Sequence, residues 1–164
     1  MTRRPSISPA CRIVYYMPTS AGTEPKEFFQ GIASACAVAQ IVQAAGLVVK
    51  VTLALPLRCL QDGYTHSVFA VTLKDYEEDL DIARLLSAGA SGLFREYIFS
   101  SLKHIADNYV SGGLGFAVAR SEIKNVIAPL FESDISIFGN DAMEKAGIEE
   151  VIKDIEKVVR LGGE

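Results

Sequence analysis

Short β-branched runs and longer helical stripes alternate along the chain. Residues 12–17 (RIVYYM) and 47–55 (LVVKVTLAL) are predicted strands, because both are apolar and rich in β-branched or aromatic residues. Between them, an apolar stretch with helical spacing begins near Pro25 and ends before Gly46, which suits a helix terminus. A strand, a helix and a strand in this order form a βαβ unit, so the two strands should be parallel.

The rest of the chain continues the pattern. Residues 67–74 predict a third strand, and the preceding link lacks helical periodicity, so a hairpin with an antiparallel strand is expected. The later elements are predicted as helices over 80–87, 91–106, 121–130 and 148–161 and as strands over 114–119 and 134–138. This order predicts an α/β fold: a three-layer, Rossmann-like sandwich with a mostly parallel sheet and one antiparallel edge strand. A flexible tail (residues 1–10) should precede one domain (residues 11–164).

Apolar periodicity also predicts the core. The inward faces of the central elements should bury Ile13, Ile32, Cys36, Val51 and Ile137. The helix that starts near Ser121 should present one apolar face made of Ile123, Val126, Ile127 and Leu130. The last helix has a similar stripe, formed by Ile148, Val151, Ile152, Ile155, Val158 and Val159.

Composition narrows the class of protein. The chain of 164 residues is 49% hydrophobic and 22% charged, which excludes a disordered protein. Its net charge of −4 and the lack of a basic cluster argue against non-specific nucleic-acid binding. Neither a signal-peptide core nor an uninterrupted apolar span is present, so no membrane association is expected. We therefore expect a cytoplasmic protein whose cysteines (Cys11, Cys36 and Cys59) are reduced.

Candidate binding residues lie where strands are expected to end, at residues 18–24 and 74–79. They are Thr19, Ser20, Gly22 and Thr23, before the first helix, and Lys74 and Asp75 after the third strand. The first group could hold a phosphate or nucleotide at the helix N-terminus, but it lacks a glycine-rich phosphate motif and also fits an ordinary capped turn. The acidic run 75–81 could bind Mg²⁺ or Ca²⁺, or simply begin a helix. No catalytic residue, metal ligand or cofactor is assigned.

Three segments resemble von Willebrand factor A-type domains, in the cobaltochelatase-subunit-like branch and its phage and bacterial relatives. They are residues 15–22 (YYMPTSAG), residues 71–86 (VTLKDYEEDLDIARLL) and residues 114–138 with the final helix. The metal site of that family needs an Asp after the first strand and two hydroxyl residues. Here Met17 stands at the Asp position and Ala21 at the second hydroxyl position, and only Thr19 could serve. The resemblance therefore implies the fold and a protein-interaction role without the metal site.

Three functions remain open. The first is a non-catalytic protein-interaction module, favoured by the resemblance and by a mean hydropathy of +0.24. The alternative is a small α/β protein, such as an enzyme, that binds a nucleotide or phosphate in the loop after the first strand. The third is a protein that binds a divalent metal ion. The helices carry more apolar residues than one core-facing side of each can hold. We therefore expect the remaining apolar residues to form the interface of a homodimer or hetero-complex, with Phe99 near the contact.

Overall fold

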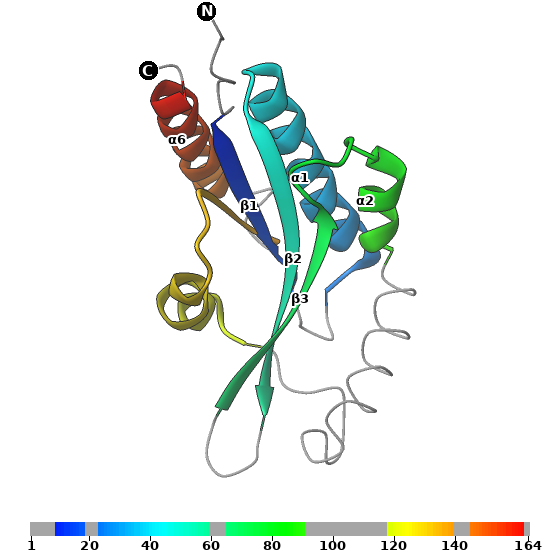
Figure 1. Ribbon diagram of the computed structural model, residues 1–164. Coiled ribbons are helices and arrows are strands. Elements are labelled where there is room, and N and C mark those ends of the chain that lie inside the picture. The colour runs from blue at the N-terminus through cyan, green and yellow to red at the C-terminus, as the bar shows by residue number, and fades with distance from the viewer. Residues whose placement is uncertain (1–8, 19–22, 60–64, 91–117, 140–144, 163–164) are drawn as a thin grey trace, which may run out of the picture.

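A single four-stranded sheet organises the computed structural model, which describes residues 9–18, 23–59, 65–90, 118–139 and 145–162 (Figure 1). The strands are β1 (Ala10–Tyr16), β2 (Val48–Cys59), β3 (Thr65–Lys74) and β4 (Ile135–Phe138). Their order is β3-β2-β1-β4, with β1 parallel to both neighbours and β3 antiparallel to β2. The predictions of a mixed α/β fold, a mostly parallel sheet and an antiparallel edge strand are confirmed.

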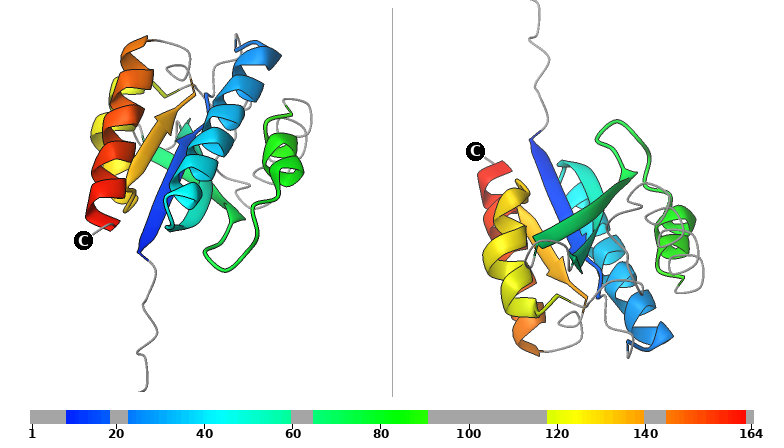
Figure 2. Two further views of the ribbon diagram at one scale, coloured as in Figure 1. Left: turned by 90° about the horizontal axis from the view of Figure 1, so that it is seen from above. Right: turned by 90° about the horizontal axis from the view of Figure 1, so that it is seen from below.

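Helices lie on both sides of this sheet (Figure 2). The left panel shows one side, with α1 (Pro25–Ala44), α2 (Ile82–Ala88) and α6 (Lys145–Gly162) in front of the strands. The other side carries a short helical segment in three parts: α5 (Arg120–Glu122), the π-helix η2 (Ile123–Ile127) and the 3₁₀-helix η3 (Ala128–Leu130). None of the helices in the described ranges combines the length and hydropathy needed to cross a bilayer.

The βαβ unit forms as its sequence predicts. Glu24 is the N-cap of α1 and Pro25 is its first residue, where the missing N–H costs no helical hydrogen bond. After the helix, Gly46 adopts φ +89°, a left-handed conformation that side chains disfavour. The chain thereby turns directly into β2, and Leu47 donates back to the Val42 carbonyl at 3.3 Å.

The main core lies between the sheet and the helices α1, α2 and α6. All five residues predicted to form it are buried: Ile13, Ile32, Cys36, Val51 and Ile137. Small residues of α1 bring the helix backbone close to the sheet, notably Gly31, Ala35 and Ala39, all buried. This close approach explains why the first helix is apolar over so much of its surface.

A second, smaller core covers the opposite face near the ends of β1 and β4. Tyr16 stacks on Phe138 with ring centroids 5.0 Å apart and meets Phe131 edge-on at 6.1 Å. Lys124 of η2 lies over the Phe138 ring and pairs with Glu150 of α6 at 2.7 Å. Since η2 and α6 lie on opposite faces of the sheet, this ion pair passes the outer edge of β4.

Two predicted helix faces are wrong in part. Ile123 and Ile127 are buried, but Val126 and Leu130 are exposed. The segment is not a regular α-helix: Val126 lies in the π-helix η2 and Leu130 in the 3₁₀-helix η3, and both have a different residue spacing on each face. On α6, Val151, Ile155 and Val158 face the core, whereas Ile148 and Ile152 are 44% and 48% exposed.

Other predictions meet the limits of the described residues. Strand β1 begins at Ala10, inside the expected tail, because Ala10 pairs with Val48 and the Pro9 carbonyl accepts from the Val48 N–H. Val118 and Ala119 belong to no strand and lead into α5. The rest of the strand predicted over 114–119, the helix predicted over 91–106 and Phe99 lie outside the described residues.

Candidate functional site

The edge where β1 and β4 end is the natural ligand edge of this sheet. After β1, the chain forms β2 and then β3 on one side of β1, and it returns to form β4 on the other side. The order of the strands therefore reverses between β1 and β4. Ligands of open α/β sheets bind outside the carboxyl ends of strands at such a point. Of the predicted residues here, Thr23 is described and is buried, whereas Thr19, Ser20 and Gly22 lie outside the described residues.

The N-terminus of α1 points to this edge and is already occupied by carboxylates. The Glu24 N–H donates to Glu27 Oε2 at 2.8 Å, and the Glu24 carboxylate pairs with Lys26 at 2.6 Å. The hydrogen bond from Lys26 lowers the pKa of Glu24 below its ordinary value. Acidic side chains complement the positive end of the helix dipole in the way a bound anion would. The helix terminus is thus a capped turn, and a phosphate there would meet two carboxylates.

Tyr15 lies at the same edge. It is fully buried, burial raises the pKa of its hydroxyl, and that hydroxyl has no hydrogen-bond partner among the described residues. Its position depends on two glycines: a Cβ on Gly31 would lie 2.1 Å from the Tyr15 hydroxyl oxygen, and one on Gly139 would lie 3.0 Å from it. The ring therefore fills the space between α1 and the end of β4.

Met17 stands where the von Willebrand resemblance expects a metal-binding carboxylate. It is fully buried within the main core, and its backbone N–H donates to the Ala54 carbonyl at 2.9 Å. A thioether is a soft ligand that does not suit Mg²⁺ or Ca²⁺, which prefer oxygen. Across the described ranges, no three His, Cys, Asp or Glu side chains gather closely enough to hold a metal ion.

Lys74 and Asp75 do not belong to this edge. The sequence prediction placed them beside residues 18–24 because they follow a strand, but β3 is antiparallel, so its end lies at the opposite edge. The register shows this: Lys74 pairs with Val51, near the start of β2, whereas Cys59 at the end of β2 pairs with Thr65. The sheet therefore separates Lys74 and Asp75 from Thr23, the described member of the first group, so these three residues do not form one site.

The buried Lys74 serves the fold. Only 1% of it is exposed, and its ammonium donates to the carbonyls of Val49 at 2.7 Å and Asp75 at 2.9 Å. Burial lowers the pKa of Lys74, and the nearby Glu78, Asp75 and Asp79 oppose this change. The amine thus holds the turn after β3 against the first residues of β2.

This pKa gives a testable pH dependence. Because the pKa of Lys74 is lower in the folded chain than the ordinary 10.5, the unfolded chain binds more protons between the two values. We expect the free energy of unfolding, relative to Lys74→Met, to rise as pH approaches 10.5 and to level off above it. Urea unfolding of both proteins across this pH range measures the difference; a constant or falling difference would contradict a depressed pKa.

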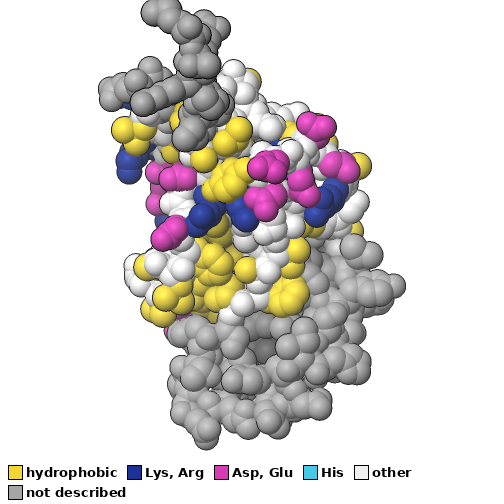
Figure 3. Space-filling view, in the orientation of Figure 1, with side chains coloured by type: hydrophobic (Ala, Val, Ile, Leu, Met, Phe, Trp, Pro, Cys, Tyr) yellow, Lys and Arg dark blue, Asp and Glu magenta, His cyan; other side chains and the backbone are white. Residues whose placement is uncertain are grey.

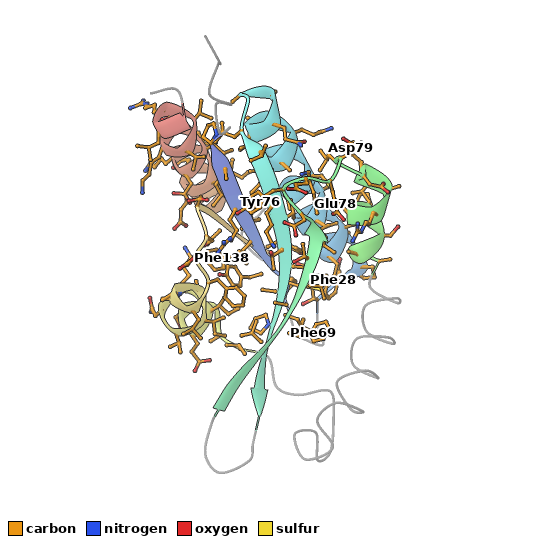
Figure 4. The ribbon with its side chains drawn as sticks, viewed as in Figure 1. Phe28, Phe69, Tyr76, Glu78, Asp79 and Phe138 are labelled. Atoms are coloured by element: carbon orange, nitrogen blue, oxygen red, sulfur yellow. The ribbon has the colours of Figure 1, made fainter. Side chains whose placement is uncertain are left out.

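A cluster that the sequence did not predict lies at the same edge. Arg12 and Lys50 are direct neighbours on β1 and β2, and like charges so placed repel. Acidic side chains from two loops neutralise them: Glu132 approaches Arg12 at 3.3 Å, and Asp75 approaches Lys50 at 3.4 Å. Figure 3 shows acidic and basic side chains intermingled on this face, and Figure 4 shows Tyr76 in front of the strands there.

A polar pocket of about 280 Å³ opens within this cluster and is lined by Arg12, Tyr76, Glu132, Ser133 and Asp134. Hydrogen bonds cross it: the Arg12 guanidinium donates to the Glu132 backbone carbonyl at 2.9 Å, and the Arg12 backbone N–H donates to the Asp134 carboxylate at 2.7 Å. Arg12 Nε has no hydrogen-bond partner among the described residues. The cluster thereby ties the loops before β4 and after β3 to the sheet. Only knowledge of the strand register could have revealed it.

The acidic run after β3 is also accounted for by local structure. Asp81 is the N-cap of α2 and accepts from the Arg84 N–H at 3.0 Å. The Asp75 N–H donates to Glu78 at 2.9 Å, and Figure 4 shows Glu78 and Asp79 on the side toward α2. These carboxylates cap a turn and a helix start, as the alternative interpretation of the sequence proposed.

Comparison with known proteins gives a match to a family model. No curated protein and no solved structure matches the chain. A family model described as "Domain of unknown function (DUF7192)" matches residues 1–158, nearly the whole chain. The chain belongs to the DUF7192 family.

Proposed function

We propose that the chain is a non-catalytic protein-interaction module, a three-layer domain of von Willebrand A-like fold that lacks the metal-dependent adhesion site. The antiparallel edge strand β3 and the helices on both faces of the sheet support this fold. Met17 is buried at the position where von Willebrand A-type domains have a metal-binding Asp, which supports the loss of the metal site. The free thiols of Cys11 and Cys36 support an activity in the cytoplasm.

One observation carries the proposal: α6 exposes two large apolar side chains next to each other. Ile148 and Ile152 lie one helical turn apart, so they adjoin on one side of α6. That side differs from the one bearing Glu150, which pairs with Lys124 past the β4 edge. Adjoining exposed apolar side chains are typical of protein interfaces. We call the exposed side of α6 that bears them the α6 surface.

The alternative, a nucleotide- or phosphate-binding protein, has less support. At the N-terminus of α1, Glu24 and Glu27 would repel an anion, and Pro25 offers no N–H to it. The other predicted residues, Lys74 and Asp75, lie at the opposite edge of the sheet.

Thermal unfolding in the presence of Mg²⁺, Ca²⁺, ATP or inorganic phosphate separates these functions. A ligand at about 100 times its Kd raises the free energy of unfolding by roughly 2.7 kcal/mol. We expect no upward shift from any of the four, because the first loop offers neither a carboxylate cage nor an open helix terminus. A clear rise with ATP or phosphate would support the alternative function, and a rise with Mg²⁺ or Ca²⁺ a metal site.

A further inference from the structure

The sequence of the α6 surface points to its partner. We propose that it binds the same surface of a second copy of the chain, with the two α6 helices antiparallel about a two-fold axis. This inference rests on the proposed interaction function and identifies the partner. In such an isologous contact, if residue i of one helix meets residue j of the other, then residue j of the first helix meets residue i of the second.

An apolar row provides the first half of the complementarity. Ile148, Ile152, Ile155 and Val159 follow one another at intervals of four, three and four residues, which is the spacing of a helix-pairing seam. Ile148 and Ile152 are exposed. Ile155, which also packs against the main core, and Val159 are half-buried, so part of each side chain remains open to a partner. Because the intervals read the same in reverse, an antiparallel copy sets Ile148 against Val159 and Ile152 against Ile155.

A row of charged residues, one position further along, provides the second half. Glu149, Lys153, Glu156 and Arg160 have the same intervals, alternate in sign and are all exposed. In an antiparallel pair, Glu149 meets Arg160 and Lys153 meets Glu156 of the other copy, so every charge faces its opposite. In a parallel pair the two copies of this row would lie on opposite sides of the seam, so only the antiparallel pair brings these charges together. Charges at the rim of an interface select partner and orientation in this way.

The balance of this row also argues against a partner of a single charge sign. Two of its four residues are acidic and two are basic, so a uniformly acidic or basic helix would be repelled by half of them. The Glu156–Arg160 contact within one helix is long, at 4.0 Å, and solvent-exposed, and such pairs exchange partners at little cost.

Two charge-reversal variants test this arrangement. The acidic-row variant carries Lys153→Glu and Arg160→Glu, and the basic-row variant carries Glu149→Lys and Glu156→Lys. By light scattering at tens of micromolar, wild type should have twice the chain mass of 17.7 kDa, and each variant alone half the wild-type value. An equimolar mixture of the two should regain the doubled mass. Lys157→Glu, exposed on the same helix but outside the row, is the control and should remain dimeric.

Three outcomes would overturn the proposal: a monomeric wild type, dimeric single variants, or a mixture that stays monomeric although circular dichroism shows both variants folded. The same experiments distinguish an error in the proposed partner from an error in the proposed function. If wild type is monomeric and ATP or phosphate stabilises it, the interaction function fails as well. If it is monomeric, no ligand stabilises it, and Ile148→Glu with Ile152→Glu releases it from a larger cellular complex, the function stands and the second copy is replaced by another partner.

Discussion

Gly31→Ala is expected to destabilise the fold by about 3 kcal/mol, although alanine is the better helix former by about 1 kcal/mol. The added Cβ would lie 2.1 Å from the hydroxyl oxygen and 2.6 Å from Cζ of Tyr15. Tyr15 is fully buried, so its ring can move away only by displacing its neighbours in the core. Urea unfolding monitored by circular dichroism measures the change.

A double-mutant cycle with Tyr15→Leu tests the cause. Leucine lacks the ring atoms that clash, so the double variant should be more stable than the sum of single effects by about 1–2 kcal/mol. Gly46→Ala is the matched control: its φ of +89° makes alanine costly by about 1–2 kcal/mol, yet no atom lies within 4 Å of its Cβ. Tyr15→Leu should not rescue it. Additive effects at Gly31 would show that the contact with Tyr15 is not the reason for the glycine.

Ile32→Ala should cost about 2–5 kcal/mol, because it opens a cavity in the centre of the main core. Ile32 is fully buried on α1 and packs so closely on α2 that a Cβ on Gly89 would lie 2.3 Å from its Cγ2. The same substitution at Ile41, which is exposed on the same helix, should cost less than about 0.5 kcal/mol. A loss below 0.5 kcal/mol at Ile32 would mean that another face of α1 meets the sheet.

Local signals predicted the elements well. Pro25 and Gly46 mark both ends of α1, and the β-branched runs mark β1, β2 and β4, because these signals depend on backbone preferences of the residues themselves. The antiparallel β3 also followed from a local feature, the short link before it. Where the fold depends on residues close in sequence, the pattern was sufficient.

The predictions are wrong where the structure depends on contacts between residues that are distant in sequence. The π-helical turns of η2 expose Val126, which an α-helical pattern assigns to the buried face. Lys74 was assigned to the wrong edge, because the direction of β3 was not carried through to the location of its end. The Arg12 and Lys50 cluster depends on register, and the close approach at Gly31 depends on Tyr15 of another element. None of these is encoded within a single segment.

Methyl NMR of the isoleucines compares the two proposed modes of action in one experiment. Spectra are recorded over a range of protein concentrations, and then with Mg²⁺, ATP and phosphate. If the α6 surface binds a second copy of the chain, the resonances of Ile148 and Ile152 shift or broaden with concentration, while those of the buried Ile32 and Ile137 do not, and the ligands change nothing. Ligand-induced shifts at Ile32, whose helix α1 begins at the carboxyl edge, with Ile148 and Ile152 unaffected by concentration, would contradict this account.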